Sequence, residues 1–146
     1  HFNSALNFDD LGLTQGYSTL KAYGRSKLMN LLTARELQHR LRGKNVVASS
    51  FHPGTVRTPI WNKGGMLARL LGLALYPFMK SIGQGSDTFV WLASSEDQAS
   101  KEADGHYFYE SKRAETAKFA TAEDAKRLWQ ISEELIAPYC LLDAGS

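Results

Sequence analysis

The order of its apolar patterns constrains the fold of this chain more than any other feature. Apolar residues recur at helical spacing in three stretches, 20–42, 81–94 and 121–136, and form two short runs between them, 45–51 and 105–109. Short runs bounded by glycine or proline are typical of buried strands, and the longer periodic stretches are typical of amphipathic helices. The predicted order of helix, strand, helix, strand and helix indicates an α/β layered fold with a parallel sheet.

Two strands are too few for such a sheet. A two-stranded parallel sheet among three helices would leave an unpaired strand edge and an uncovered face. We therefore expect the remaining strands to lie in residues outside this sequence. Because the chain starts with His1 rather than methionine, we also expect its beginning to be a cut.

Cap and breaker residues set the expected boundaries of the helices. Gly43 and Pro138 are predicted to stop the first and last helices, and Ser81 and Thr121 are predicted to cap the second and third. The candidate core positions of the three helices are Leu28, Leu31, Leu32, Leu37, Leu41, Ile82, Phe89, Val90, Leu92, Ala93, Leu128, Ile131, Leu135 and Ile136.

Composition narrows the classes of function. Of the 146 residues, 17 are basic and 15 acidic, and no run of five or six like charges occurs, so nucleic acid is not the expected partner. Cys140 is the only cysteine, which excludes an internal disulfide and a cysteine-based zinc site and suits a reducing, cytoplasmic location. The histidines are not spaced as metal ligands, and we expect no metal site.

Tyr23 and Lys27 are the first candidates for chemistry. Four positions apart on one helix, they share a face about one turn apart, so the lysine charge stabilises the tyrosinate and makes the phenol a usable proton donor. The spacing alone also fits an ordinary tyrosine beside a solvated lysine. Ser26 is predicted to form a local hydrogen bond rather than to react.

The pair Pro53-Gly54 is the second candidate. It follows the first predicted strand, and the carboxyl ends of strands are where ligands of open α/β sheets bind. Taken by itself, a proline-glycine pair is also an ordinary loop signal.

A family resemblance rests on both motifs together. The first is Ala22-Tyr23-Gly24-Arg25-Ser26-Lys27-Leu28-Met29-Asn30 with Glu36-Leu37, and the second is His52-Pro53-Gly54-Thr55-Val56-Arg57-Thr58. Further matches are Lys80-Ser81, Gln84-Gly85, Gly105 before Tyr107-Phe108, Leu128-Trp129 and Ser132-Glu133. In this order they resemble the short-chain dehydrogenase/reductase superfamily, and within it the retinol dehydrogenases and WW-domain oxidoreductases. The resemblance implies the C-terminal part of a Rossmann-like doubly wound parallel sheet whose N-terminal nucleotide-binding half is missing.

The resemblance also implies the roles of the site residues. Tyr23 would exchange a proton with the substrate oxygen, and Lys27 would assist it and bind the nicotinamide ribose. Pro53 and Gly54 would turn the chain so that the following backbone approaches the nicotinamide. The backbone of Val56 would meet the carboxamide, while the hydroxyl and N–H of Thr58 would meet the diphosphate.

The implied activity is that of an NAD(P)-dependent oxidoreductase that interconverts an apolar alcohol and its carbonyl. NADP is the expected cofactor, with NAD as the alternative. The catalytic serine and the glycine-rich loop of the family are expected upstream of His1, because Ser4 lies in a polar loop rather than at a strand end. The isolated chain is therefore expected to be inactive. The alternatives are a non-catalytic scaffold of the same fold and an incomplete product.

The apolar stretch 66–79 is expected to cover the substrate, with contact to a membrane surface as an equal alternative and core packing as a third. The alternative to a cytoplasmic location is a peripheral one on a membrane that faces the cytosol. A homodimer is one candidate state of assembly. We interpret the whole chain as part of one domain with five segments: loop 1–19, catalytic helix 20–42, strand and turn 45–58, substrate lid 59–80, and C-terminal helices with the last strand 81–146.

Overall fold

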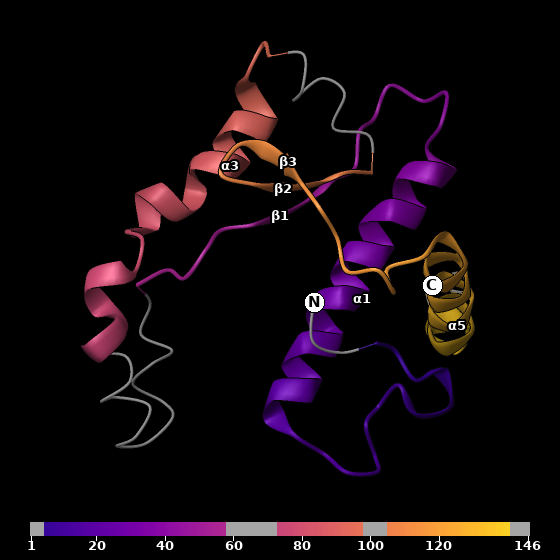
Figure 1. Cartoon of the computed structure of the whole chain (residues 1–146). Coiled ribbons are helices and arrows are strands. Elements are labelled where there is room, and N and C mark those ends of the chain that lie inside the picture. The colour runs from indigo at the N-terminus through magenta and orange to yellow at the C-terminus, as the bar shows by residue number, and fades with distance from the viewer. Residues whose placement is uncertain (1–4, 58–72, 98–104, 141–146) are drawn as a thin grey trace. The chain divides into compact units, whose positions relative to one another are not determined.

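The computed structural model describes residues 5–57, 73–97 and 105–140. They belong to two compact units. The first comprises His1–Ser50, Asp104–Tyr107 and Glu115–Ser146, and the second comprises Phe51–Ala103 and Phe108–Ala114. The elements, labelled in Figure 1, are α1 (Thr19–Arg40), β1 (Ser50–His52), α3 (Ile82–Ser94), β2 (Tyr107–Tyr109), β3 (Lys112–Ala114) and α5 (Ala122–Cys140), with single 3-10 turns at Phe8–Asp10 and Tyr76–Phe78.

The first unit is built on the packing of α5 against α1. Leu28, Leu31 and Leu32 of α1 are buried against Ala125 and Leu128 of α5. This confirms three of the predicted core positions of the first helix, whereas Leu37, also predicted as a core residue, is exposed. The predicted end of α1 before Gly43 is also confirmed. The helix stops at Arg40, and Gly43 has a φ of +77°, a left-handed conformation that suits glycine.

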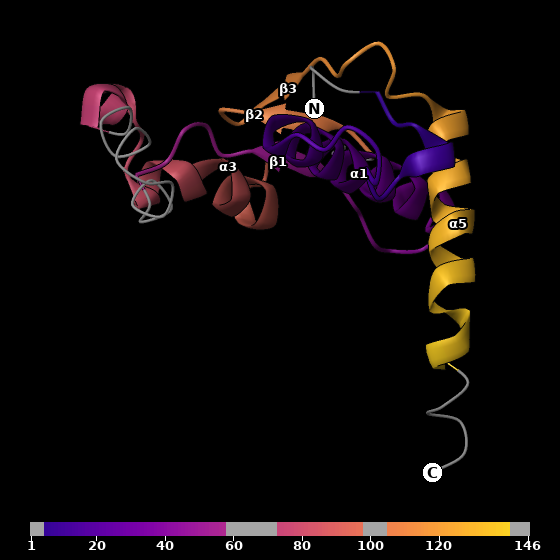
Figure 2. The same cartoon turned by 90° about the horizontal axis from the view of Figure 1, so that it is seen from below.

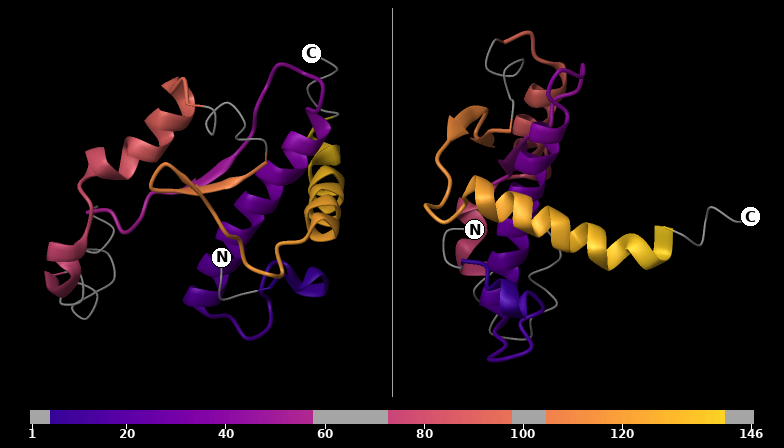
Figure 3. Two further views of the ribbon diagram at one scale, coloured as in Figure 1. Left: turned by 45° about the horizontal axis from the view of Figure 1, so that its top comes forward. Right: turned by 90° about the vertical axis from the view of Figure 1, so that its right-hand side faces the viewer.

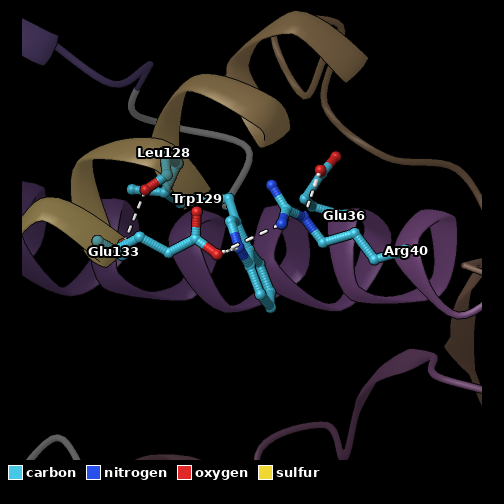
Figure 4. Close-up of polar contacts among 6 residues, drawn as sticks. Glu36, Arg40, Leu128, Trp129 and Glu133 are labelled. Atoms are coloured by element: carbon cyan, nitrogen blue, oxygen red, sulfur yellow. Dashed lines mark hydrogen bonds and ion pairs between the residues drawn. The ribbon is translucent and has the colours of Figure 1, made fainter. Parts of the chain in front are cut away.

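Polar residues on α1 and α5 add to this packing (Figure 4). The guanidinium of Arg40 donates from Nε to Glu36 (2.9 Å) and from Nη1 to Glu133 (3.3 Å). It also lies 4.7 Å from the centre of the Trp129 ring, whose Nε1 donates to the same Glu133 carboxylate at 2.6 Å. Glu36 is therefore buried in an ion pair.

The last helix differs from its prediction at its C-terminal end. Figures 2 and 3 show that the final turns of α5 extend away from α1. Leu135 and Ile136, predicted as core residues, are accordingly exposed. Pro138 does not stop the helix, which continues to Cys140. The carbonyl group that Pro138 leaves without its helical donor lies in an exposed turn, where water can solvate it.

The second unit contains most of a small sheet with the strand order β1-β2-β3. Only two residues, Glu110 and Ser111, connect β2 to β3, so these strands form an antiparallel hairpin. The chain is therefore α/β with a mixed sheet, and the sequence-based prediction lacked β3. Phe108 of β2 is buried and its ring lies 5.7 Å from that of Trp91 on α3.

The first strand is shorter than predicted. β1 begins at Ser50, and Val46 and Val47 lie before it with about half of each residue exposed. Ala48 is held by other contacts: its N–H donates to the Gln38 side chain, and its carbonyl accepts from Gly105 at 2.9 Å. The backbone before β1 is thus satisfied outside the sheet.

Helix α3 has the predicted cap but a different buried face. The Ser81 hydroxyl accepts from the Gln84 N–H (3.2 Å), and the Gln84 side chain accepts from the Ser81 N–H (2.9 Å), which forms a capping box. The buried residues of α3 are Gly85 and Thr88, whereas the predicted core residues Ile82, Phe89 and Val90 are exposed. Small residues are buried here because other parts of the second unit approach α3 closely.

Candidate functional site

Tyr23 and Lys27 lie on the exposed face of α1. The ammonium nitrogen of Lys27 is 5.3 Å from the centre of the Tyr23 ring, so the two side chains meet as their spacing predicts. Tyr23 is 61% exposed, while the neighbouring residues Gly24 and Leu28 of α1 are buried. An accessible phenol beside a fixed positive charge suits proton exchange with a bound molecule.

Two residues of α1 next to this pair form hydrogen bonds of their own. The Ser26 hydroxyl donates to the Tyr23 carbonyl at 2.8 Å, which confirms its predicted local role. Arg25 reaches the preceding loop and donates from Nη1 to the Asp10 carbonyl at 2.9 Å.

The loop before α1 is ordered by Asp10. Its carboxylate accepts hydrogen bonds from the Thr14 N–H (2.7 Å), the Thr14 hydroxyl (2.9 Å) and the Gln15 N–H (3.1 Å). Because these bonds favour the ionised form, above all the one from the Thr14 N–H, they hold the pKa of Asp10 below its usual value of 3.8. Asp10 was not among the predicted site residues, although an aspartate just before a glycine-containing turn is a signal for such bonding.

The Pro53-Gly54 turn follows β1 directly, as predicted. Gly54 has a φ of +82°, a left-handed conformation that glycine adopts without strain. Beyond it, Val56 forms a parallel bridge with Lys80: the Lys80 N–H donates to the Thr55 carbonyl (2.8 Å), and the Arg57 N–H donates to the Lys80 carbonyl (3.0 Å). In such a bridge the N–H and C=O of Val56 itself point to the opposite edge.

Gly85 and Lys80 pack closely against this turn. A Cβ built on Gly85 would lie 2.7 Å from Val56 Cγ2, so only glycine lets α3 approach so closely. A Cβ on Gly54 would lie 3.1 Å from Cδ of Lys80, whose ammonium pairs with Glu110 at 2.8 Å. Lys80 and Gly85 were predicted only as family matches, without a role at the turn. Glu110 was not predicted because it lies far away in sequence.

Several predicted features lie outside the described residues. These are Thr58, Ser4, and the part of the expected substrate lid at 59–72. The described end of that lid includes the 3-10 turn Tyr76–Phe78, where the Arg57 guanidinium lies 4.4 Å from the centre of the Tyr76 ring.

The two groups of candidate residues belong to different compact units, the Tyr23 and Lys27 pair to the first and the turn at Pro53, Gly54 and Val56 to the second. Among the residues with described positions, no cluster of His, Cys, Asp or Glu could hold a metal ion. None of the described helices is long and apolar enough to cross a bilayer.

Known proteins provide close comparisons, although no family model matches the chain. Retinol dehydrogenase 14 of Homo sapiens is 38% identical over 135 residues, which are 90% of the chain and 40% of that protein. Retinol dehydrogenase 12 of Mus musculus is 39% identical over 137 residues, 93% of the chain and 42% of that protein. The WW domain-containing oxidoreductase of Pongo abelii is 34% identical over 133 residues, 90% of the chain and 32% of that protein.

The chain spans about two fifths of the length of the retinol dehydrogenases that it matches. The names of these relatives all describe oxidoreductases, in agreement with the resemblance found in the two motifs. Over about nine tenths of its length, the chain is therefore homologous to members of the short-chain dehydrogenase/reductase family.

Proposed function

We propose that this chain carries the proton-transfer pair and one cofactor-binding turn of a nicotinamide-dependent oxidoreductase. The observation that carries the proposal is the Tyr23 and Lys27 pair, exposed on one face of α1 with the ammonium 5.3 Å from the ring centre. Homology to retinol dehydrogenases supports an apolar alcohol, or the matching carbonyl, as the substrate. NADP is the proposed cofactor, with NAD as the alternative.

In this proposal Tyr23 moves the proton. Its phenol hydroxyl donates a proton to the substrate oxygen during carbonyl reduction, and the tyrosinate takes a proton from the alcohol in the reverse direction. Lys27 is proposed to assist Tyr23, since its ammonium lies 5.3 Å from the centre of the Tyr23 ring. A bound nicotinamide cofactor would supply or accept the hydride.

The turn in the second unit fits such a cofactor. The left-handed Gly54 carries no Cβ, and the outer edge of Val56 presents one N–H donor and one C=O acceptor away from Lys80. A carboxamide needs one acceptor and one donor from the protein, so this edge matches it. Thr58 is proposed to bind the diphosphate, and Lys27 to bind the nicotinamide ribose.

The test compares Tyr23→Phe with the wild type in the protein expressed from its complete reading frame. Loss of a positioned general acid costs roughly 10²–10⁴ in rate, so kcat should fall by this factor while the dissociation constant of the cofactor stays the same. Tyr139→Phe is the matched control, since it removes the hydroxyl of another exposed tyrosine near the end of α5. An unchanged kcat in Tyr23→Phe would refute the role of Tyr23.

A further inference from the structure

Lys80 touches the Pro53-Gly54 turn through both its backbone and its side chain. Its N–H and carbonyl form the hydrogen bonds to Thr55 and Arg57 on either side of Val56. Its Cδ and Cε atoms lie 3.1 and 3.2 Å from the place where a Cβ on Gly54 would be. The hydrocarbon part of the lysine therefore lies directly against the open face of the glycine.

The far end of the same side chain is fixed at the β2–β3 hairpin. The ammonium of Lys80 forms an ion pair with Glu110 Oε1 at 2.8 Å and lies 4.8 Å from the centre of the Tyr109 ring. The Lys80 side chain is only 25% exposed, so the pair is screened less than a fully solvated one. One side chain thus joins the hairpin to the turn within the second unit.

The hairpin turn presents Glu110 to Lys80 at a cost in backbone strain. Glu110 and Ser111 both have left-handed φ values, +51° and +56°, which two-residue hairpin turns require and which asparagine and glycine adopt most readily. Neither residue is of that type. The conformation is supported by the ion pair and by the Ser111 N–H, which donates to the buried hydroxyl of Thr88 on α3 at 3.1 Å. Strain kept in place by specific contacts is a feature of functional sites.

We propose that Lys80 is a positioning residue, and that its ion pair with Glu110 holds the Pro53–Val56 turn in the conformation that binds the cofactor. The inference deepens the proposed function and rests on it for the identity of the ligand. Neither residue needs to touch the cofactor. Lys80 acts through Gly54 and Val56, whose backbone it fixes.

The charge state of the pair agrees with this role. The hydrogen bond from Lys80 lowers the pKa of Glu110, and the same bond raises the pKa of Lys80. The other charged or titratable groups near the pair are Asp87 and Tyr109, which favour the charged lysine, and Lys112, which favours the charged glutamate. Both partners therefore stay ionised across neutral pH.

The test uses Glu110→Gln, Lys80→Met and Lys80→Arg in the protein expressed from its complete reading frame. Glu110→Gln and Lys80→Met keep the size of each side chain and remove the ion pair. We expect each to raise the dissociation constant and the KM of NADP about tenfold with little change in kcat. Lys80→Arg keeps the charge and should retain most of the affinity. Lys126→Met is the matched control, since it removes an exposed lysine of α5, in the first unit.

Two further measurements separate positioning from general stability. The double variant Lys80→Met/Glu110→Gln should bind NADP no more weakly than Lys80→Met alone, because the second change removes nothing more. In the wild type the affinity should fall only as the pH passes through the lowered pKa of Glu110, which lies below the usual value of 4.5, and Glu110→Gln should lack this step.

Amide hydrogen exchange makes the test independent of the cofactor. In Glu110→Gln the N–H groups of Arg57 and Lys80, which form the bridge, should exchange about tenfold faster, while that of Ala125 in α5 should not change. Unchanged exchange at Arg57 and Lys80 together with unchanged NADP affinity would overturn the positioning role. If the wild type binds neither NADP nor NAD, the proposed function fails, and the exchange rates still decide whether Lys80 holds the turn.

Discussion

Gly85 on α3 is a position where one added methyl group has no room. Its Cβ would lie 2.7 Å from Cγ2 and 3.3 Å from Cγ1 of Val56, whereas non-bonded carbon atoms prefer about 3.5–4.0 Å. Gly83, two residues earlier on the same helix, offers a matched control, because its Cβ would have only the Ser81 hydroxyl nearby, at 3.9 Å. Substitution by alanine therefore brings a methyl group against Val56 at position 85 but not at position 83.

We expect the two alanine variants to change the free energy of unfolding in opposite directions. Alanine is favoured over glycine in a helix by up to about 1 kcal/mol, so Gly83→Ala should raise the free energy of unfolding by up to that amount. Forcing an extra methyl group into a filled space costs about 1–3 kcal/mol, which outweighs this gain at Gly85. Gly85→Ala should therefore lower the free energy of unfolding by up to about 2 kcal/mol.

Urea unfolding of the protein from its complete reading frame measures both effects, with Val56→Ala as the second change in a double-mutant cycle. Truncating Val56 removes both Cγ atoms and leaves its Cβ 3.6 Å from the new methyl group, which is an ordinary contact. In that background Gly85→Ala should behave like Gly83→Ala. Equal stabilisation by the two alanines in the wild-type background would refute the steric argument. Under the proposed function, Gly85→Ala should also weaken cofactor binding, because it displaces Val56.

Two other predictions concern the first unit. Leu128 is 5% exposed, so Leu128→Ala should lower the free energy of unfolding by about 2–5 kcal/mol. Leu135 of the same helix is 66% exposed, so Leu135→Ala should change it by less than about 0.5 kcal/mol. Equal effects of the two variants in urea unfolding would contradict the packing of α5 on α1. The lowered pKa of Asp10 means that its contribution to stability is present above about pH 3.8 and is lost as the pH falls through the folded-state value. Thr14→Val, which removes one of the three hydrogen bonds, should raise the Asp10 pKa measured by carboxyl NMR, and an unchanged pKa would show that this bond does not form in solution.

Features that depend on neighbours in the sequence were predicted well. The capping box of α3 needs only Ser81 and Gln84, three positions apart, and the N-cap of α5 needs only the Thr121 hydroxyl and the Asp124 N–H. The approach of Lys27 to Tyr23 likewise follows from one turn of helix. Local hydrogen bonds and helical spacing determine each of these features.

Features that depend on distant contacts were not predicted. The buried face of α3 is set by what packs on it, so Thr88 is buried under the hairpin while the more hydrophobic Phe89 is exposed. The third strand was missed because Glu110 and Ser111 are not typical residues of a two-residue turn. Their conformation depends on Lys80 and Thr88, which are more than twenty positions away.

The same distinction separates the reacting residues of the proposed site from those that hold it. The proposed proton-transfer pair lies on one helix, so its spacing predicts that the two side chains meet. The turn at Gly54 is instead supported by the segment 80–85. In this segment Lys80 forms the bridge with Val56, Ser81 caps α3, and Gly85 packs on the Val56 side chain. Because the cap fixes where α3 begins, it also fixes the distance between the bridge and the close packing of Gly85. Residues 80–85 therefore jointly set the position of the Val56 backbone edge.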